Sequence, residues 1–457
     1  MRIAFFGVLS PIRSGVADYC QNLLPELKEL MDIDVFIDDY DPEEPGVASQ
    51  FQVFNYLRFE RRGKKEKYDA IVYQMGNDLH HRFMYHYIFN FPGIVVLHDF
   101  NLHPSRASML QASGDQATYA RELEECLGSK GPEVARLVTT GAQFNALLDT
   151  FPMNEKVLRQ SLAVIVHNPY VKRMVEKAAP DTPAYLVNMG IPVRKNVLKK
   201  AQARRKLNLP LEKFVALYPG FVGPHRKPDV ALDAFARFIE KHPNALLVFT
   251  GDPDPRVDLA SEAKRRGLDK FIKLENYVSD EAFDSYITAS DVVLNLRTNK
   301  IRETSATMLT AMSLGRPVIA TRLIHNCHLP TDTCLFIEHS PTEADDLAQR
   351  LEQLWSNPNE GEKIGKAAQA YIKDNHSIKQ AAQGYKTAID ATLAATTENT
   401  KSTKHARTLR ERLIWLDEEK QRIVNDLSGA TQGKVLADEL ERAMAELGLG
   451  CAAIESE

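Results

Sequence analysis

Short apolar runs alternate along the chain with longer segments in which apolar residues recur at helical spacing. Among the first 192 residues, runs at 3–8, 33–37, 70–73, 94–97 and 163–166 predict buried strands, and residues 16–30 have a helical pattern. Strands that alternate with helices are typical of a parallel sheet covered by helices. We therefore predict an N-terminal Rossmann-like domain over residues 1–192.

A second series of the same kind follows. Strands are predicted at 215–218, 245–250, 272–275, 292–296 and 317–320, with helices at 228–241 and 257–266. This series predicts a second Rossmann-like domain over residues 193–376. The fold class is α/β, with two Rossmann-like domains facing across a cleft and a C-terminal helical extension.

The last part of the chain has a different pattern. Residues 377–395 are expected to form a helix that crosses back to the N-terminal domain, and residues 396–403 read as a polar linker. Apolar residues then recur at four-and-three spacing from Leu409 to Leu427, and a second helix is expected over 435–447. The tail, 396–457, would either mediate oligomers or pack back on its own domain.

Composition narrows the class of protein. The 457 residues are 44% hydrophobic and 26% charged, and the net charge of −4 argues against a nucleic-acid partner. The five cysteines lack metal-binding spacing, which suggests reduced thiols. The first residues run straight into a strand, and no apolar stretch approaches the ~18 residues that span a bilayer. We expect a cytoplasmic protein, at most peripheral at a membrane face.

One basic segment bears on that membrane question. It contains Arg58, Arg61, Arg62, Lys64, Lys65 and Lys67, with the acids Glu60 and Glu66 interspersed. Such a cluster either touches anionic lipid headgroups or is an ordinary solvated surface.

Two adjacent cations mark a candidate anion site in the second domain. Arg226 and Lys227 follow the strand 215–218 and Gly220, and they directly precede a helix predicted to begin at Pro228. A helix N-terminus attracts anions through its free N–H groups and its dipole, and adjacent cations reinforce that attraction. The segment predicts a diphosphate clamp; the alternative is a pair of solvated loop charges.

A second candidate segment follows the strand 292–296. Thr304 or Ser305 can cap the next helix, Gly315 can end it, and Glu303 places a carboxylate beside the helix start. Glu303 either serves ligand binding or only complements the helix dipole. Its position after a strand of an open α/β sheet favours ligand binding.

With these residues in place, the chain resembles the retaining GT-B glycosyltransferases of sequence family 4 over about 390 residues. The motifs that carry the resemblance are residues 14–19, His98-Asp99, 187–191, 220–227, 279–281, 289–291, Glu303 and 315–319. The resemblance implies that Arg226 and Lys227 stabilise the leaving diphosphate. It also implies that Glu303 touches donor-sugar hydroxyls and that the backbone N–H groups of Thr304, Ser305 and Ala306 hold phosphate.

The sequence departs from the family at one point. The family has two Glu residues separated by seven others, whereas Ala311 lies eight residues beyond Glu303. An alignment anchored on Ala311 instead places Thr310 at the ribose-binding Glu and Arg302 at the first Glu. We prefer Glu303, and the resemblance then leaves ribose recognition without its usual acid.

The N-terminal domain contributes two further candidates. Gly15 opens the helix after the first strand and lets a ligand approach the backbone closely. His98 ends the strand 94–97, and by resemblance it contacts the donor sugar, although a histidine there can also be a buried structural residue. No histidine pattern indicates a metal, so we predict neither a metal nor another cofactor.

The sequence therefore predicts a retaining hexosyltransferase-type enzyme that moves a sugar from a nucleotide-diphosphate sugar to a glycan or lipid-linked acceptor, as in polysaccharide biosynthesis. Two alternatives are open: a GT-B sugar-nucleotide epimerase and a catalytically silent GT-B assembly subunit. The missing second Glu and the heptad pattern of the tail are the reasons to keep the silent subunit as an alternative.

Overall fold

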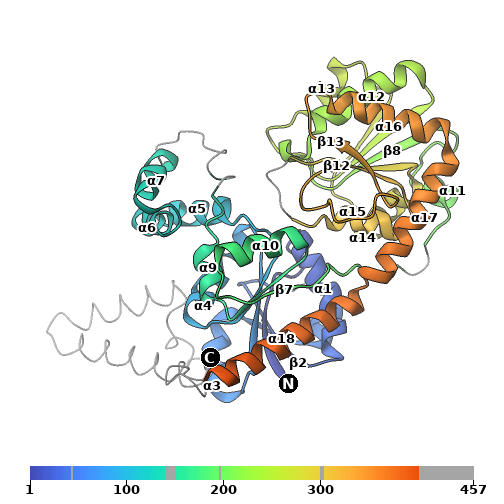
Figure 1. Cartoon of the computed structure of the whole chain (residues 1–457). Coiled ribbons are helices and arrows are strands. Elements are labelled where there is room, and N and C mark those ends of the chain that lie inside the picture. Colours follow the sequence, from blue (N-terminus) through green and yellow to red (C-terminus); the bar gives the residue numbers. More distant parts are fainter. Residues whose placement is uncertain (43–44, 140–147, 149–150, 195–196, 299–302, 401–457) are drawn as a thin grey trace, which may run out of the picture. The chain divides into compact units, whose positions relative to one another are not determined.

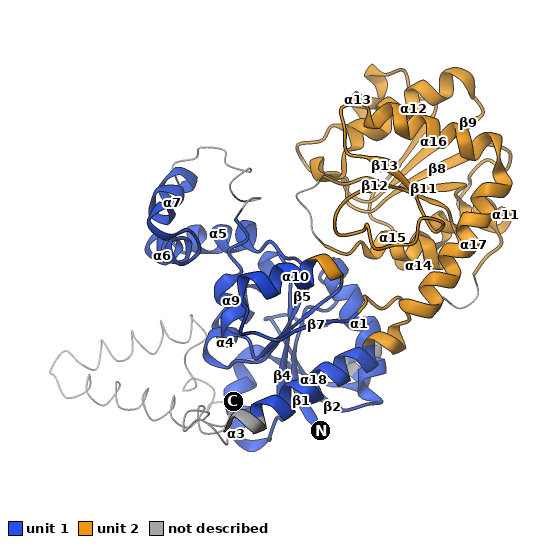
Figure 2. Cartoon of the chain, in the orientation of Figure 1, with its two compact units in different colours: residues 1–167, 171–187, 382–457 blue, residues 168–170, 188–381 orange. Residues whose placement is uncertain are grey.

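A computed structural model describes residues 1–42, 45–139, 148, 151–194, 197–298 and 303–400 (Figure 1). The chain divides into two compact units (Figure 2). Unit 1 contains residues 1–167, 171–187 and the chain from 382 onward, and unit 2 contains residues 168–170 and 188–381.

Unit 1 is built on a seven-stranded sheet in the order β3-β2-β1-β4-β5-β6-β7, with every pairing parallel. The strands are β1 (Arg2–Phe6), β2 (Asp32–Ile37), β3 (Gln52–Asn55), β4 (Ala70–Met75), β5 (Ile94–Leu97), β6 (Ala163–Val166) and β7 (Ala184–Leu186). The five predicted strands are confirmed. The two edge strands, β3 and β7, were not predicted, because they are short and contain no fully buried residue.

Helices connect and cover these strands. They are α1 (Gly15–Lys28), α2 (Pro45–Gln50), α3 (Phe59–Lys65), α4 (Arg82–Asn90), α5 (His103–Ala112), α6 (Gln116–Leu127), α7 (Gly131–Thr139), α9 (Glu155–Gln160) and α10 (Pro169–Ala178). Between β5 and β6, the helices α5, α6 and α7 pack around a small apolar cluster of their own that includes Leu110, Tyr119 and Leu123.

Unit 2 contains a six-stranded parallel sheet in the order β10-β9-β8-β11-β12-β13. Its strands are β8 (Phe214–Pro219), β9 (Ala245–Thr250), β10 (Ile272–Glu275), β11 (Val292–Asn295), β12 (Val318–Arg322) and β13 (Leu335–Glu338). Its helices are α11 (Lys200–Lys206), α12 (Pro228–Lys241), α13 (Leu259–Arg265), α14 (Asp280–Ala289), α15 (Ala306–Ser313), α16 (Glu343–Ser356) and α17 (Pro358–Asn375). The predicted strands and helices are confirmed, and β13 is added at one edge.

Helix α18 (Ile378–Thr400) returns the chain to unit 1. Tyr385, Ala388 and Ile389 are buried, and Gly384 is so close to Val187 that an added Cβ would lie 2.7 Å from its Cγ1. The helix continues through residues 396–400, which we expected in the linker, so that part of the linker prediction is wrong. The rest of the predicted tail, 401–457, lies outside the described residues.

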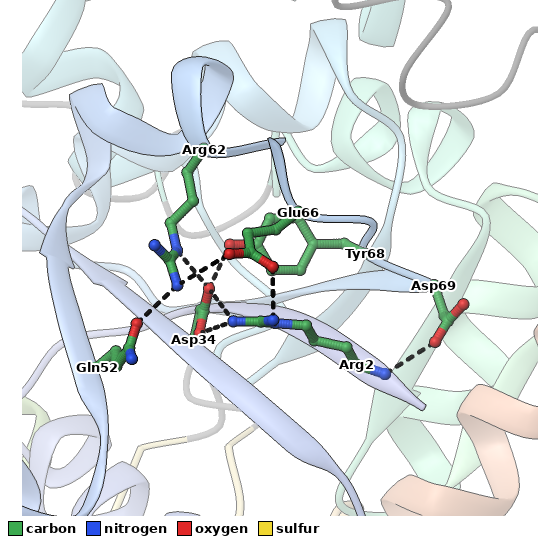
Figure 3. A network of polar contacts seen from close by, with 7 residues as sticks. All are labelled: Arg2, Asp34, Gln52, Arg62, Glu66, Tyr68 and Asp69. Atoms are coloured by element: carbon green, nitrogen blue, oxygen red, sulfur yellow. Dashed lines mark hydrogen bonds and ion pairs between the residues drawn. The ribbon is translucent and has the colours of Figure 1, made fainter. Parts of the chain in front are cut away.

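An ion-pair network in unit 1 joins β1, β2 and α3 (Figure 3). Asp34, 2% exposed, accepts hydrogen bonds from Arg62 (2.5 Å), Tyr68 (2.6 Å) and Arg2 (3.0 Å). Burial raises the pKa of the Asp34 carboxyl, but these hydrogen bonds outweigh it and the pKa is lowered. Arg62, a member of the predicted basic cluster, therefore has a structural role.

Within the described part of the chain, no helix has the length and hydrophobicity needed to span a membrane.

Candidate functional site

The predicted residues of the second domain meet where the strand order of unit 2 reverses. From β8 the chain proceeds outward to β9 and β10, and it then returns to β11 on the other side of β8. The segment 220–227 follows β8 and the segment 303–306 follows β11. The carboxyl ends of strands at such a switch point form the usual ligand site of an open α/β sheet.

Two glycines shape the loop after β8. Gly220 has φ +86° and its N–H donates to the Thr250 carbonyl at 2.6 Å. Gly251 has φ +120°, and a Cβ there would lie 2.5 Å from the carbonyl carbon of Gly220. A Cβ on Gly220 would lie 2.8 Å from Nη1 of Arg226, which donates to the Pro219 carbonyl at 2.9 Å. Gly220 is therefore needed to seat the Arg226 guanidinium against the end of β8.

Lys227 is held differently from Arg226. It has left-handed backbone angles (φ 54°, ψ 55°), directly precedes α12 and is 6% exposed. Its ammonium pairs with the buried carboxylate of Glu343, which begins α16, and lies 2.7 Å from Nδ1 of His339. The structure thus places the charge of Lys227 in a buried ion pair rather than in the open loop.

Arg297, which we did not select from the sequence, is the second arginine of this site. It follows β11 and is 4% exposed. Its guanidinium pairs with Glu303 and donates to Oγ of Ser305 at 3.0 Å. The backbone N–H of Arg297 donates to Oγ1 of Thr321 at 3.2 Å, and the Thr321 hydroxyl donates to the Glu343 carboxylate at 2.9 Å. Hydrogen bonds therefore connect the Lys227 pair to the Arg297 pair.

Ser305 fixes the start of α15. Its hydroxyl oxygen accepts hydrogen bonds from Met308 N–H (3.3 Å), from Arg297 and from Asn295 (3.0 Å). The predicted cap is thus Ser305, and Ala306 is the first helical residue. Gly315, with φ +68°, follows the end of the helix.

The remaining predicted residues of this segment are placed as follows. Thr304 directly precedes the cap and is partly buried. Thr310 is 7% exposed, and its carbonyl accepts from Ser313. Arg302, the alternative to Glu303, lies outside the described residues.

The site is electropositive. Burial, reinforced by Arg297, lowers the pKa of Arg226 to about 10, and burial with both arginines lowers the pKa of His225 to about 4. Arg226 therefore remains charged at neutral pH. Arg226, Lys227 and Arg297 supply three positive charges against two carboxylates, Glu303 and Glu343, which leaves one positive charge uncompensated.

Neither arginine is saturated by hydrogen bonds. The buried Nε atoms of Arg226 and Arg297 have no hydrogen-bond partner among the described residues. The charge of Arg297 contributes to the lowered pKa of Arg226, and two cationic side chains this close together favour binding of an anion.

The two candidates of unit 1 lie at the carboxyl edge of its sheet. Gly15 is the first residue of α1, capped by Ser14, and a Cβ there would meet no heavy atom within 4 Å. His98 follows β5 and is 8% exposed, and its Nε2 lies 2.8 Å from Oε1 of Gln74. Burial, together with His167 and His81, lowers the pKa of His98 well below its ordinary value, so the ring is neutral at pH 7.

No group of three or more His, Cys, Asp or Glu residues in the described part of the chain could hold a metal ion. The predicted independence from metals stays a prediction.

The fold and the switch-point site define the class: the chain has the GT-B fold, whose two Rossmann-like domains are seen here as units 1 and 2. Sucrose-phosphate synthase of Thermosynechococcus elongatus is similar at 17% identity and TM-score 0.61, over 86% of this chain and all of that one. HepE of Anabaena, solved with UDP, is similar at 15% identity and TM-score 0.61, with the same coverages. A glycosyltransferase of Rickettsia africae is similar at 14% identity and TM-score 0.60, over 86% of this chain and 98% of that one.

Residues 199–371 match the family described as glycosyl transferases group 1. The matched segment contains every candidate residue of unit 2. A comparison with curated proteins gave no match. The family match over residues 199–371 supports glycosyl transfer as the general activity, and the solved structures show the shared fold.

Proposed function

We propose that the protein is a retaining glycosyltransferase of family 4 that moves a hexosyl group from a nucleoside-diphosphate sugar to a glycan or lipid-linked acceptor. The observation that carries the proposal is the arginine pair at the switch point of unit 2. The charge of Arg297 opposes that of Arg226 in a partly dehydrated site. A diphosphate would relieve this repulsion.

The arginine pair suits the chemistry of the reaction. The bond between C1 of the sugar and the phosphate oxygen breaks, and the acceptor oxygen bonds to C1 on the same face. The acceptor proton passes to an oxygen of the leaving diphosphate. Negative charge grows on that diphosphate as the bond stretches, so cations fixed beside it stabilise the transition state more than the bound donor.

Three other residues support the donor site in this proposal: Glu303, Ser305 and Lys227. Arg297 orients the Glu303 carboxylate, which would accept hydrogen bonds from hydroxyls of the donor sugar. Ser305 fixes the N-terminus of α15, whose free N–H groups would bind phosphate oxygens. Lys227 has a supporting role, because Glu343 already compensates its charge.

The identity of the donor is the first point to test, by measuring which nucleotide sugar binds. The solved structures of HepE contain UDP and UDP-glucose, so UDP-glucose comes first, with GDP- and ADP-glucose as competitors. A bound donor raises the thermal unfolding midpoint by mass action. At a donor concentration 100 times the Kd, the free energy of unfolding increases by about 2.7 kcal/mol. If none of the three nucleotide sugars raised the unfolding midpoint, the proposal of a glucosyl donor would be contradicted.

Replacing Arg226 by Ala tests the mechanism. We expect turnover, measured as nucleoside diphosphate released in the presence of mixed glycan and glycolipid acceptors, to fall roughly 10²- to 10³-fold. Arg237→Ala is the matched control, because Arg237 is an exposed arginine of α12 that pairs with the exposed Asp345. Arg237→Ala should keep normal turnover, and normal turnover in Arg226→Ala would refute the assignment.

The same assay separates the alternatives. An epimerase would change the sugar of the donor without an acceptor, which product analysis detects. A silent subunit would bind the donor and release no nucleoside diphosphate with any acceptor.

A further inference from the structure

His339 lies beside the buried ion pair of Lys227 and Glu343 in unit 2. It directly follows β13, and Glu343 begins α16 four residues later. Its Nδ1 is 2.7 Å from Nζ of Lys227 and 3.3 Å from Oε2 of Glu343, the same oxygen that pairs with Lys227. The ammonium, the carboxylate and the imidazole therefore meet in a closed triangle.

The three side chains differ in their access to water. Lys227 is 6% exposed and Glu343 is 3% exposed, whereas the side chain of His339 is 42% exposed. The other oxygen of Glu343 already accepts a hydrogen bond from the Thr321 hydroxyl at 2.9 Å. Of the three, His339 is thus the side chain that can exchange a proton with solvent most readily.

The contact with Lys227 indicates which protonation state of His339 fits this arrangement. An ammonium has donors and no lone pair, so a distance of 2.7 Å requires an unprotonated Nδ1 that accepts the hydrogen bond. The neutral ring is then protonated at Nε2, and Lys227 donates both to His339 and to Glu343. Neutral His339 therefore supplies a second acceptor for the ammonium.

Protonation of His339 reverses this contact. Nδ1 of the imidazolium is a donor, so it repels the ammonium of Lys227 and competes with it for Oε2 of Glu343. These are the two charged groups that the described structure places against the ring, since the neighbouring Glu338 pairs with Arg322 at 2.8 Å. Histidine is the side chain whose charge ordinarily changes between pH 5 and 8. A proton taken up by the ring therefore loosens Lys227 from Glu343.

We infer that His339 is a positioning residue for Lys227: the neutral ring holds the ammonium against Glu343, and the protonated ring takes over Glu343 and releases the ammonium toward an anion. The hold on Lys227 is independent of the proposed function, whereas the identity of the anion, the diphosphate of the donor, rests on it. Protonation also adds one positive charge to the site that contains Arg226. The donor should therefore bind more tightly as the pH falls.

The affinity for UDP-glucose between pH 8 and pH 5.5 tests the release. Both phosphates of this donor are substituted on two sides, so its charge is constant over this range, whereas the terminal phosphate of UDP titrates at about pH 6. The Kd of wild type should fall roughly 3- to 10-fold from pH 8 to pH 5.5, as expected for one added charge in a partly hydrated site. An unchanged or rising Kd would overturn the release of Lys227.

His339→Asn separates the effect of His339 from that of other groups. Asn keeps an acceptor near the position of Nδ1 but cannot be protonated, so the variant should match wild type at pH 8 and bind no more tightly at pH 5.5. His242→Asn is the matched control, because His242 pairs with Glu352 at 2.8 Å at the other end of α12 from Lys227. It should keep the pH dependence of wild type. The same pH dependence in His339→Asn would refute the role of His339.

NMR on protein with ¹⁵N-labelled histidine tests the hold on Lys227 without any ligand. His339, assigned by loss of its signals in His339→Asn, should be protonated at Nε2 at pH 8. In Lys227→Met the ammonium is absent, so Nδ1 should become protonated and donate to Glu343. A wild-type ring protonated at Nδ1 would overturn the inference even if Lys227→Met does not fold. If UDP-glucose bound at no pH, the proposed donor would fail, and the NMR comparison would still decide whether His339 holds Lys227.

Discussion

The ion pair between Lys227 and Glu343 links the stability of unit 2 to its ligand, and replacing Glu343 by Gln tests that link. Lys227 is 6% exposed and Glu343 is 3% exposed, so neither charge is solvated by water. The variant keeps the size of the side chain and a hydrogen-bond acceptor but removes the negative charge. Lys227 is then a buried ammonium with no compensating carboxylate.

The expected loss follows from this burial. Removing one partner of a buried pair costs about 3–5 kcal/mol, and the amide that replaces the carboxylate puts the effect near the lower figure. For a unit of this size, about 3 kcal/mol corresponds to a fall of roughly 6–12 °C in the unfolding midpoint. The replacement Glu343→Gln with Lys227→Met removes both charges and should recover most of that loss.

A diphosphate ligand should have the opposite effect. In Glu343→Gln the uncompensated ammonium can pair with phosphate, so UDP should raise the unfolding midpoint of the variant more than that of wild type. Thermal unfolding at a series of UDP concentrations measures both effects. An unchanged midpoint without ligand would show that the pair contributes little. An equal shift by UDP in both proteins would place Lys227 away from the diphosphate.

Two further predictions concern the two units separately. Asp34→Asn should lower the unfolding midpoint at pH 7. Because the folded-state pKa of Asp34 is lowered, the extra stability of wild type should be fully present above the unfolded-state pKa of about 3.9 and should disappear as the pH falls through the folded-state pKa. A difference in midpoint that does not depend on pH would contradict this. Gly251→Ala should lower the free energy of unfolding by roughly 1–3 kcal/mol, because its Cβ would overlap Gly220 at a positive φ; an unchanged unfolding midpoint would contradict this.

Most of the fold could be predicted because buried parallel strands read as continuous apolar runs. The strands β5, β6, β9 and β10 have the predicted bounds, and so does α12. The edge strands β3 and β7 escaped prediction because they are short and none of their residues is fully buried. The edge strand β13 was also missed although two of its residues are buried, whereas the edge strand β10 was predicted.

The site was predictable where its chemistry is local in sequence. Arg226 and the cap at Ser305 lie at the junction of a strand with a helix, and such junctions are visible in the hydrophobic pattern. Arg297 could have been selected by the same criterion, since it follows the predicted strand 292–296. The partner of Lys227 could not, because Glu343 lies 116 residues away and follows a strand that the pattern did not reveal.

The return of α18 to unit 1 sets an order of assembly during synthesis. Unit 2 is nearly contiguous, so its sheet can form as soon as residues 188–381 have left the ribosome. Unit 1 is begun first, yet it must wait for Tyr385 and its neighbours on α18, which bury against the early strands. The half of the protein that is translated first is thus the half that is completed last.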